Sequence, residues 1–169
     1  MASQQQSSNT PADVRDEWRT PLFVYDWIDT RFEFGVDLAA SHVNHLSDAY
    51  VTRGENSLVQ DWSRLAGPGF CNPPYSDIDP WLEKAVTEAR KGFTSVFLIP
   101  TPNGEDRYGE YVFDVASEII FITGRLVFLR PDGAPVSGNT RGSCFVVYRG
   151  HDLGSTRYRH VLRDSMRAA

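Results

Sequence analysis

The sequence contains little cysteine and no long hydrophobic run. Among its 169 residues only two are cysteines, Cys71 and Cys144, and each lies next to a phenylalanine. Free thiols in apolar surroundings are typical of proteins kept in a reducing compartment, so we expect no disulfide and a cytoplasmic protein. No apolar run approaches the roughly 20 residues that a membrane-spanning helix requires, so we expect no membrane partner.

The N-terminal stretch lacks the features of a secretory leader, which begins with basic residues and continues with an apolar segment. Residues 1–17 are instead polar, with several Gln and Ser residues, and we expect them to form a disordered tail. The rest of the chain is long enough for one domain with a substantial core. We expect this domain to span residues 18–150 and a basic segment, a short helix or a tail, to follow at 151–169.

The net charge of −5 at pH 7 is unevenly distributed along the chain. Residues 1–121 hold 9 basic side chains against 19 acidic ones, whereas residues 122–169 hold 8 basic against 3 acidic. Such asymmetry indicates that the C-terminal part faces a polyanion, although a basic tail that is only solvated gives the same pattern.

The spacing of apolar residues predicts an α/β fold. Residues 81–91 have helical spacing and stop at Gly92, and residues 93–99 follow as a mostly apolar run of the kind that forms a buried parallel strand. A strand, a helix and a second strand in this order require a parallel sheet. We expect further helices and strands at 21–29, 32–36, 50–52, 70–71, 108–117, 118–122, 126–129 and 144–148.

The segment Asn72-Pro73-Pro74-Tyr75 stands out because two prolines follow an apolar strand. They fix φ and remove two N–H donors, so the chain here must be a stiff loop at the carboxyl end of the strand. The Asn72 side chain and the Pro73 carbonyl remain free to accept hydrogen bonds, and Tyr75 offers a flat ring for stacking. Such a loop suits a planar substrate with an amino group.

The tetrapeptide matches the catalytic motif of S-adenosylmethionine-dependent amino-methyltransferases, and the chain resembles the phage-type DNA adenine N6-methyltransferases. The resemblance also rests on residues 18–21 (WRTP), 34–40 (FGVDLAA), 81–85 (WLEKA) and 124–128 (GRLVF). It implies a Rossmann-like class I methyltransferase domain at 18–150, with a mostly parallel central sheet and an antiparallel C-terminal hairpin. It also implies a phage protein that acts in the cytoplasm of a bacterial host and protects DNA against restriction.

The resemblance assigns catalysis to Asn72, Pro73, Pro74 and Tyr75. It implies that S-adenosylmethionine is bound by Thr20, Pro21, Asp37, Ala39, Asn56 and Asn72. Thr20 and Pro21 are also expected to cap and begin the first helix, and Asp37 to end a strand at 32–36. The chain has Asp37-Leu38-Ala39-Ala40 where many methyltransferases have a Gly-x-Gly turn. Glu55, Asn56 and Asp61 are equal candidates for the cofactor ribose and adenine.

The expected macromolecular partner is double-stranded DNA, from which the target adenine would be flipped out. The Gly- and Pro-containing loop at 130–143 is expected to contact it, together with the loop at 101–107. Arg125, Arg130 and Arg141 are the candidate DNA-binding residues. No metal is expected, because His42 and His45 have no further ligand nearby in the sequence.

Two other functions remain open at this point. The tetrapeptide also occurs in methyltransferases that act on protein glutamine or on RNA. The missing Gly-x-Gly turn is also compatible with a catalytically silent methyltransferase fold that serves as a binding module. Oligomeric state and recognition sequence leave no mark in the sequence.

Overall fold

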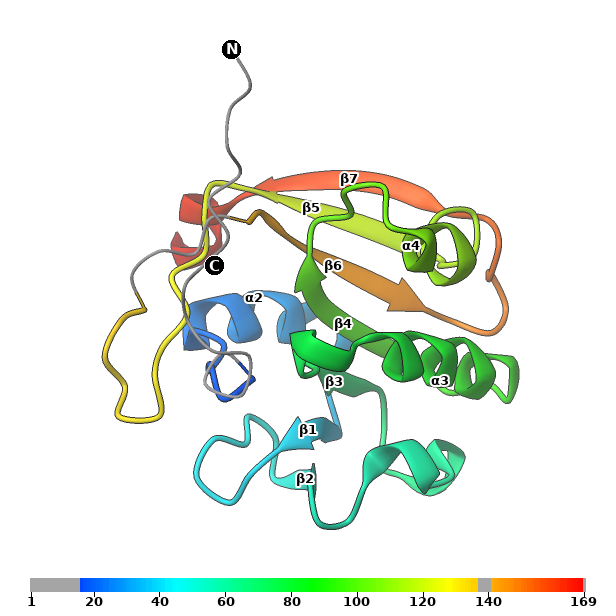
Figure 1. Ribbon diagram of the computed structural model, residues 1–169, viewed down its shortest axis with the longest axis horizontal. Coiled ribbons are helices and arrows are strands. Elements are labelled where there is room, and N and C mark those ends of the chain that lie inside the picture. Colours follow the sequence, from blue (N-terminus) through cyan, green and yellow to red (C-terminus); the bar gives the residue numbers. More distant parts are fainter. Residues whose placement is uncertain (1–15, 137–140, 169) are drawn as a thin grey trace.

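The protein forms a twisted sheet of seven strands in the order β2-β1-β3-β4-β6-β5-β7 (Figure 1). The structure is a computed structural model and describes residues 16–136 and 141–168. Only β6 runs against its neighbours, β4 and β5; all other pairs are parallel. The strands are β1 Val36–Ala40, β2 Ala49–Thr52, β3 Gly69–Cys71, β4 Ser95–Pro100, β5 Glu118–Thr123, β6 Ser143–Tyr148 and β7 Arg157–Leu162. The predicted α/β class, the mostly parallel sheet and the antiparallel β5–β6 hairpin are confirmed.

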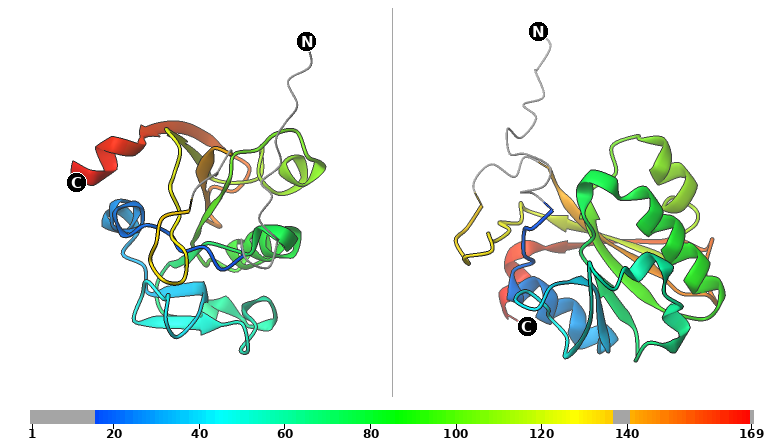
Figure 2. Two further views of the ribbon diagram at one scale, coloured as in Figure 1. Left: turned by 60° about the vertical axis from the view of Figure 1, so that its left-hand side comes forward. Right: turned by 60° about the horizontal axis from the view of Figure 1, so that its bottom comes forward.

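Helices cover both faces of the sheet (Figure 2). Helix α2 (Leu22–Phe32) lies on one face, where the short 3-10 helix η4 (Arg163–Ala168) contacts it. Helices α3 (Asp79–Arg90) and α4 (Asp106–Tyr111) lie on the other face. The core is therefore divided into two apolar layers, one on each side of the fully buried strands β4 and β6.

The first helix and the first strand differ from the expectation. The helix begins at Leu22 with Pro21 as its cap and has no side-chain capping bond, so the predicted capping role of Thr20 is wrong. It continues to Phe32 and ends at Glu33, which adopts a left-handed φ of 52°. The strand predicted at 32–36 starts only at Val36. Asp37 therefore lies inside β1, not at its carboxyl end.

Three further predictions need correction. The helix expected at 108–117 spans only Asp106–Tyr111. The strand expected at 126–129 is absent; Leu129 forms only isolated bridges to Arg19 and Pro135. The segment expected to be a tail or a short helix ends in the short 3-10 helix η4, but it also contributes β7, which pairs in parallel with β5 at the edge of the sheet. The expectation for residues 1–15 lies outside the described residues.

A buried carboxylate joins four elements at the start of β5. The Glu118 side chain is fully buried and accepts hydrogen bonds from both terminal nitrogens of Arg31 at 2.9 and 2.6 Å. Arg149 and Arg159 also contact it, at 3.4 and 3.2 Å. Burial opposes ionisation, but the hydrogen bond and charge of Arg31, with those of the other two arginines, hold the pKa of Glu118 below its usual range. This cluster fixes α2, β6 and β7 to β5.

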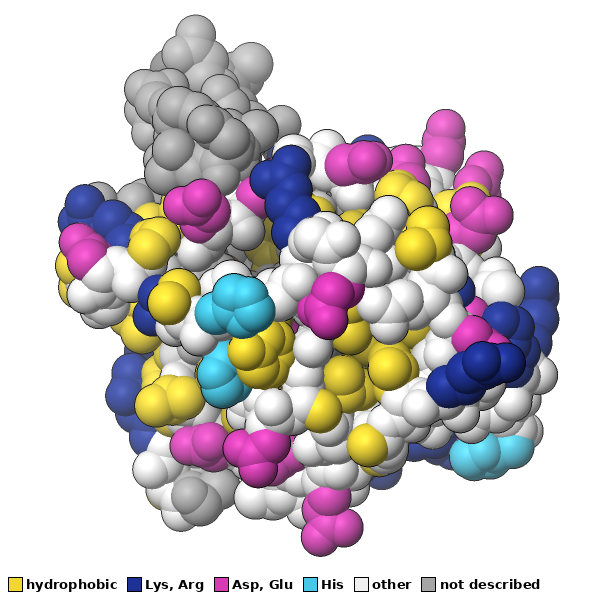
Figure 3. All heavy atoms as spheres, turned by 90° about the horizontal axis from the view of Figure 1, so that it is seen from below, with side chains coloured by type: hydrophobic (Ala, Val, Ile, Leu, Met, Phe, Trp, Pro, Cys, Tyr) yellow, Lys and Arg dark blue, Asp and Glu magenta, His cyan; other side chains and the backbone are white. Residues whose placement is uncertain are grey.

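The face around β1 and β2 carries hydrophobic side chains at its centre and acidic side chains spread around them (Figure 3). Within the described residues, no helix has the length and apolar character needed to cross a membrane. The same part of the chain contains no group of three or more His, Cys, Asp or Glu side chains arranged to hold a metal ion.

Candidate active site

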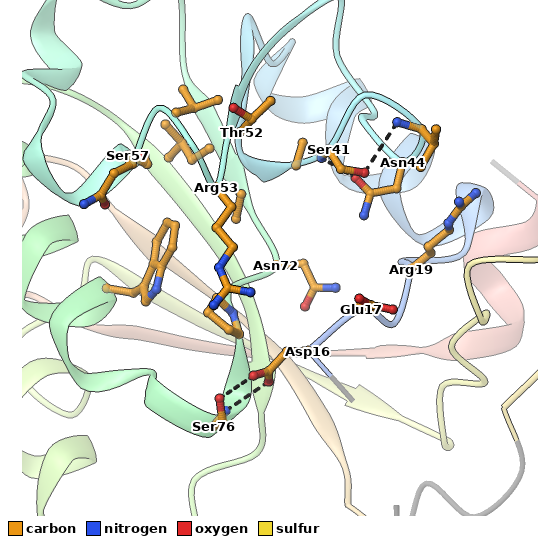
Figure 4. A pocket seen from close by; sticks show the side chains of 18 of the residues that line it. Asp16, Glu17, Arg19, Ser41, Asn44, Thr52, Arg53, Ser57, Asn72 and Ser76 are labelled. Atoms are coloured by element: carbon orange, nitrogen blue, oxygen red, sulfur yellow. Dashed lines mark hydrogen bonds between the residues drawn. The ribbon is translucent and has the colours of Figure 1, made fainter. Parts of the chain in front are cut away.

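A cavity of about 550 Å³ opens where β1, β2 and β3 end (Figure 4). The chain leaves β1 toward β2 on one side, while β3 pairs with β1 on the other side. Ligands of open α/β sheets bind at such a switch point, outside the carboxyl ends of the strands. The volume falls in the range of about 300–1,000 Å³ that is usual for small-molecule sites.

Asn72 lies at the centre of this cavity (Figure 4). It follows β3 directly, and its Nδ2 donates a hydrogen bond of 3.3 Å to the carbonyl of Trp18. This bond occupies the amide nitrogen and leaves Oδ1 as the acceptor available to a ligand. The amide is thus oriented to receive an N–H group.

The other three residues of the motif are placed differently. Pro74 lines the cavity, whereas Pro73 is buried and is not among its lining residues. Tyr75 is partly exposed, and its hydroxyl donates to the carbonyl of Leu98 at 3.2 Å. Burial of the phenol raises the pKa of Tyr75 well above its usual value, so the hydroxyl stays neutral. The ring stands edge-on to Phe128, with centroids 6.3 Å apart, and lies outside the cavity lining.

A small pocket of about 30 Å³ lies beside the main cavity and shares Asn72 and Ala39 with it. It is lined by Thr20 and Asp37, two of the predicted cofactor residues. The Thr20 hydroxyl is buried and has no hydrogen-bond partner, which is unusual for a buried polar group. The pocket is therefore lined by a residue with an unsatisfied hydroxyl and by a residue with a carboxylate.

Asp37 is almost fully buried, at 4% exposure. Desolvation raises the pKa of its carboxyl from 3.8 to about 6, although the backbone N–H groups of Ala39 and Leu46 donate to its two oxygens and oppose the shift. The backbone bonds hold the carboxylate in one orientation, and the low dielectric makes it a strong partner for a cation.

Of the three equal candidates after β2, only Asn56 lines the cavity. It adopts a left-handed φ of 52°, and its side chain caps the following 3-10 helix through the N–H of Leu58. Glu55 turns back to accept hydrogen bonds from Thr52, and Asp61 caps the next 3-10 helix. The cap roles explain why these polar residues occur here. Pro21 is buried as the cap of α2 and does not line either pocket.

The sequence reasoning missed several residues that line the cavity. Arg53 directly follows β2, and its guanidinium extends into the cavity in Figure 4. Ser57 contributes a second buried hydroxyl without a partner. Trp81, at the start of α3, forms part of the wall. Arg53 could have been predicted as a lining residue from its position directly after a strand, which is the same criterion that identified Asn56 as a candidate.

The candidate DNA-binding arginines do not line the cavity, and only the segment that carries Arg130 reaches it. Arg130 is exposed on a β-hairpin-like arm at residues 126–136, of which Pro131 reaches the cavity rim. The arm is closed by backbone bonds, among them Arg130 N to Ala134 O at 2.8 Å. Arg125 precedes the arm, and its carbonyl accepts a bond from Arg163. Arg141 lies 3.9 Å from Glu105. Residues 137–140 of the predicted loop lie outside the described part.

His42 and His45 both pack against Tyr50. The His45 ring stacks on Tyr50 with centroids 4.2 Å apart, and His42 Nδ1 lies 2.9 Å from the Tyr50 hydroxyl. They hold the loop after β1 against β2.

The sheet order and the acceptor loop at the switch point define a class of protein: an amino-methyltransferase with a Rossmann-like fold. Comparison with known proteins narrows this class. The model of the DNA N-6-adenine-methyltransferase (Dam) family matches residues 7–168, and the chain belongs to this family. The predicted resemblance to phage-type adenine N6-methyltransferases is thereby confirmed.

Two phage proteins illustrate the relationship. A protein of Escherichia phage T1 named DNA N-6-adenine-methyltransferase is 28% identical over 172 residues, which covers 92% of this chain and 71% of the phage protein. A protein of Haemophilus phage HP1 with the same name is 26% identical over 147 residues, which covers 83% of each chain.

Proposed function

We propose that the protein transfers a methyl group from S-adenosylmethionine to the exocyclic amine of an adenine flipped out of double-stranded DNA. The observation that carries the proposal is the Asn72 amide, held at the centre of a cavity at the switch point with its oxygen free. Membership of an adenine-methyltransferase family supports the choice of base. The proposed setting is a bacterial cytoplasm, where a phage enzyme would protect DNA against restriction.

The cavity and the small pocket fit the proposed cofactor. Thr20 and Ser57 each offer a buried hydroxyl without a partner, and Asp37 offers a carboxylate for a cationic group. Thr20, Asp37 and Ala39 would hold the methionine part, and Asn56 and Ser57 the adenosine part. The small side chain of Ala39 lets a ligand approach the end of β1. When bound, S-adenosylmethionine supplies an electrophilic methyl group on a sulfonium.

The protein's own contribution is to make the target nitrogen nucleophilic. The lone pair of an adenine amine is delocalised into the ring, and the amine is therefore planar and weakly reactive. The Asn72 oxygen and the Pro73 carbonyl would accept its two N–H bonds, which favours the tetrahedral nitrogen of the transition state over the planar one. Holding the amine in line with the methyl group supplies the rest of the acceleration.

The remaining predicted residues would act on the nucleic acid. The Tyr75 ring would stack on the extruded base, an interaction worth about 1–3 kcal/mol per base in other proteins. Arg125, Arg130 and Arg141 would bind phosphates, with the arm at 126–136 lying along the duplex. The loops at 101–107 and 130–143 would then determine the recognition sequence.

The test is methyl transfer from labelled S-adenosylmethionine to unmethylated double-stranded DNA, followed by digestion to nucleosides. We expect the label in N6-methyladenine, and Asn72→Ala should abolish most of it while the unfolding midpoint is retained. Full activity in that variant would contradict the role of the amide. No label in DNA with intact cofactor binding would instead indicate an RNA or protein-glutamine substrate, and no binding would indicate a silent module.

A further inference from the structure

Residues 16–20, here called the strap, run along one side of the cavity and are held at both ends. Asp16, Glu17 and Arg19 line the cavity from this side. At one end the Asp16 carboxylate accepts two hydrogen bonds from Ser76, one from its N–H at 3.2 Å and one from its hydroxyl. Figure 4 shows this double contact at the edge of the cavity. Ser76 directly follows Tyr75, so Asp16 is fastened to the loop that carries the catalytic motif.

At its other end the strap is fastened to the arm at residues 126–136. Arg19 and Leu129 exchange two backbone hydrogen bonds, of 2.7 and 3.0 Å. The Trp18 ring stacks on Phe128 with centroids 6.1 Å apart, and Phe128 in turn contacts the ring of Tyr75. The strap thus connects the arm with the catalytic loop through side chains as well as backbone.

The middle of the strap holds the catalytic amide. The Trp18 carbonyl accepts the hydrogen bond from Asn72 Nδ2. An amide side chain has an acceptor and a donor at nearly the same distance from its carbon, so rotation by half a turn would exchange them. A rotated Asn72 would present N–H groups to an incoming amine, which repels it. The Trp18 carbonyl excludes this rotamer, because a carbonyl cannot accept a bond from the amide oxygen.

We propose that Asp16 is a positioning residue for methyl transfer: by holding Ser76 it keeps the strap across the catalytic loop, and the strap keeps the Asn72 oxygen turned toward the substrate. Asp16 contacts no reacting atom and acts only through Trp18 and Asn72. The inference rests on the proposed function.

The test uses the full chain with Asp16→Ala, Asp16→Asn, Ser76→Ala and the double variant Asp16→Ala/Ser76→Ala. Asp26→Asn, an exposed carboxylate on α2, is the matched control. The single-turnover rate at saturating S-adenosylmethionine and DNA is measured for each, together with the cofactor Kd by calorimetry and the midpoint of thermal unfolding.

Asp16→Ala should slow the single turnover at least about tenfold, because small misplacements of a reacting group cost up to about 100-fold. Ser76→Ala should slow it less, because the backbone N–H of residue 76 remains. The double variant should be no slower than Asp16→Ala, since both changes remove one contact. Asp16→Asn should retain most of the rate, because its amide can accept from the N–H and donate to the hydroxyl. The control should match the unchanged protein.

Three results would overturn the inference: an unchanged rate in Asp16→Ala, additive losses in the double variant, or a weaker cofactor Kd with an unchanged single-turnover rate. A lower unfolding midpoint with an unchanged rate would make the strap a purely structural contact and would also overturn it. Failure of the proposed function has a different signature, because the unchanged protein would then transfer no label to DNA, and the inference would fall with it.

Discussion

The buried carboxyl of Asp37 should leave a measurable trace in the pH dependence of stability. Its pKa is raised from 3.8 to about 6 by desolvation beside the small pocket. A shift of about 2 units corresponds to about 3 kcal/mol at 1.36 kcal/mol per unit. Well below pH 3.8 the group is protonated in both the folded and the unfolded chain. As the pH rises from 3.8 to about 6, the unfolded chain loses this proton first, and the fold loses about 3 kcal/mol of stability over this range.

Asp37→Asn isolates this contribution. The amide does not titrate, and its nitrogen faces a backbone N–H, so the variant carries a constant penalty from one lost hydrogen bond. The free energy of unfolding of the variant, minus that of the unchanged protein, should therefore rise by about 2–3 kcal/mol between pH 4 and pH 7. Urea unfolding at half-unit pH intervals measures this difference, and carboxyl groups common to both proteins cancel.

Glu118→Gln provides a control of opposite sign. The pKa of Glu118 is lowered, so its stabilising effect is present above its ordinary range and is lost as the pH falls. The deficit of Glu118→Gln should be largest at neutral pH and shrink in acid. A difference for Asp37→Asn that stays constant from pH 4 to pH 7 would refute the reasoning, because it would mean that water reaches the carboxyl.

Further predictions concern the site and the core. S-adenosylmethionine, a cation, should bind more tightly by calorimetry as the pH rises through 6, because the Asp37 carboxyl then becomes negatively charged. This trend should vanish in Asp37→Asn; an affinity of the unchanged protein that does not depend on pH would mean that Asp37 does not bind the cofactor. Tyr75→Ala should lower methyl transfer by about 5- to 150-fold, the equivalent of the roughly 1–3 kcal/mol of base stacking, with cofactor binding close to intact. Tyr75→Phe should stay within about threefold because the ring remains; equal losses in both variants would assign the role to the hydroxyl. Glu118→Ala should cost about 3 kcal/mol in urea unfolding, since it removes the two charge-assisted hydrogen bonds that the buried carboxylate accepts from Arg31; a loss below about 1 kcal/mol would mean that water replaces these bonds. Gly35→Ala should destabilise the fold by about 1–3 kcal/mol, because its Cβ would lie 2.1 Å from the Ala66 carbonyl oxygen. An unchanged unfolding midpoint would show that the backbone at Ala66 can move away from the added Cβ without a loss of stability.

The sequence predicts those elements whose residues face a single environment. Strands β4, β5 and β6 are largely apolar because they are buried on both faces, and a continuous apolar run in the sequence predicts such a strand. The run Phe32-Glu33-Phe34 resembles a strand but ends a helix, because the two rings stack on each other at 5.7 Å beside a left-handed Glu33. Strand β7 escaped prediction because an edge strand exposes both faces and carries arginines, as protected edges do.

The sequence predicts residues of the candidate site where they belong to a short motif or directly follow a strand. Asn72 was identified from its two prolines, and the position of Asn56 followed from its place after a strand. Asp16 reaches the cavity from a segment that looked like a polar tail, and Ser76, which holds it there, lies 60 positions away in the sequence. Contacts at such separation leave no periodic pattern, so a single sequence does not reveal them.

The order of the strands has a consequence for synthesis on the ribosome. Strand β6 lies between β4 and β5 but is made after both of them. After β5 ends at Thr123, the ribosome must add 25 further residues before β6 is complete at Tyr148. At 5–20 residues per second this takes about 1–5 s. During this interval the nascent chain exposes two apolar strand edges. A chaperone that binds extended apolar segments, or a pause in translation after residue 123, would therefore decide how much of the newly made protein reaches the native sheet.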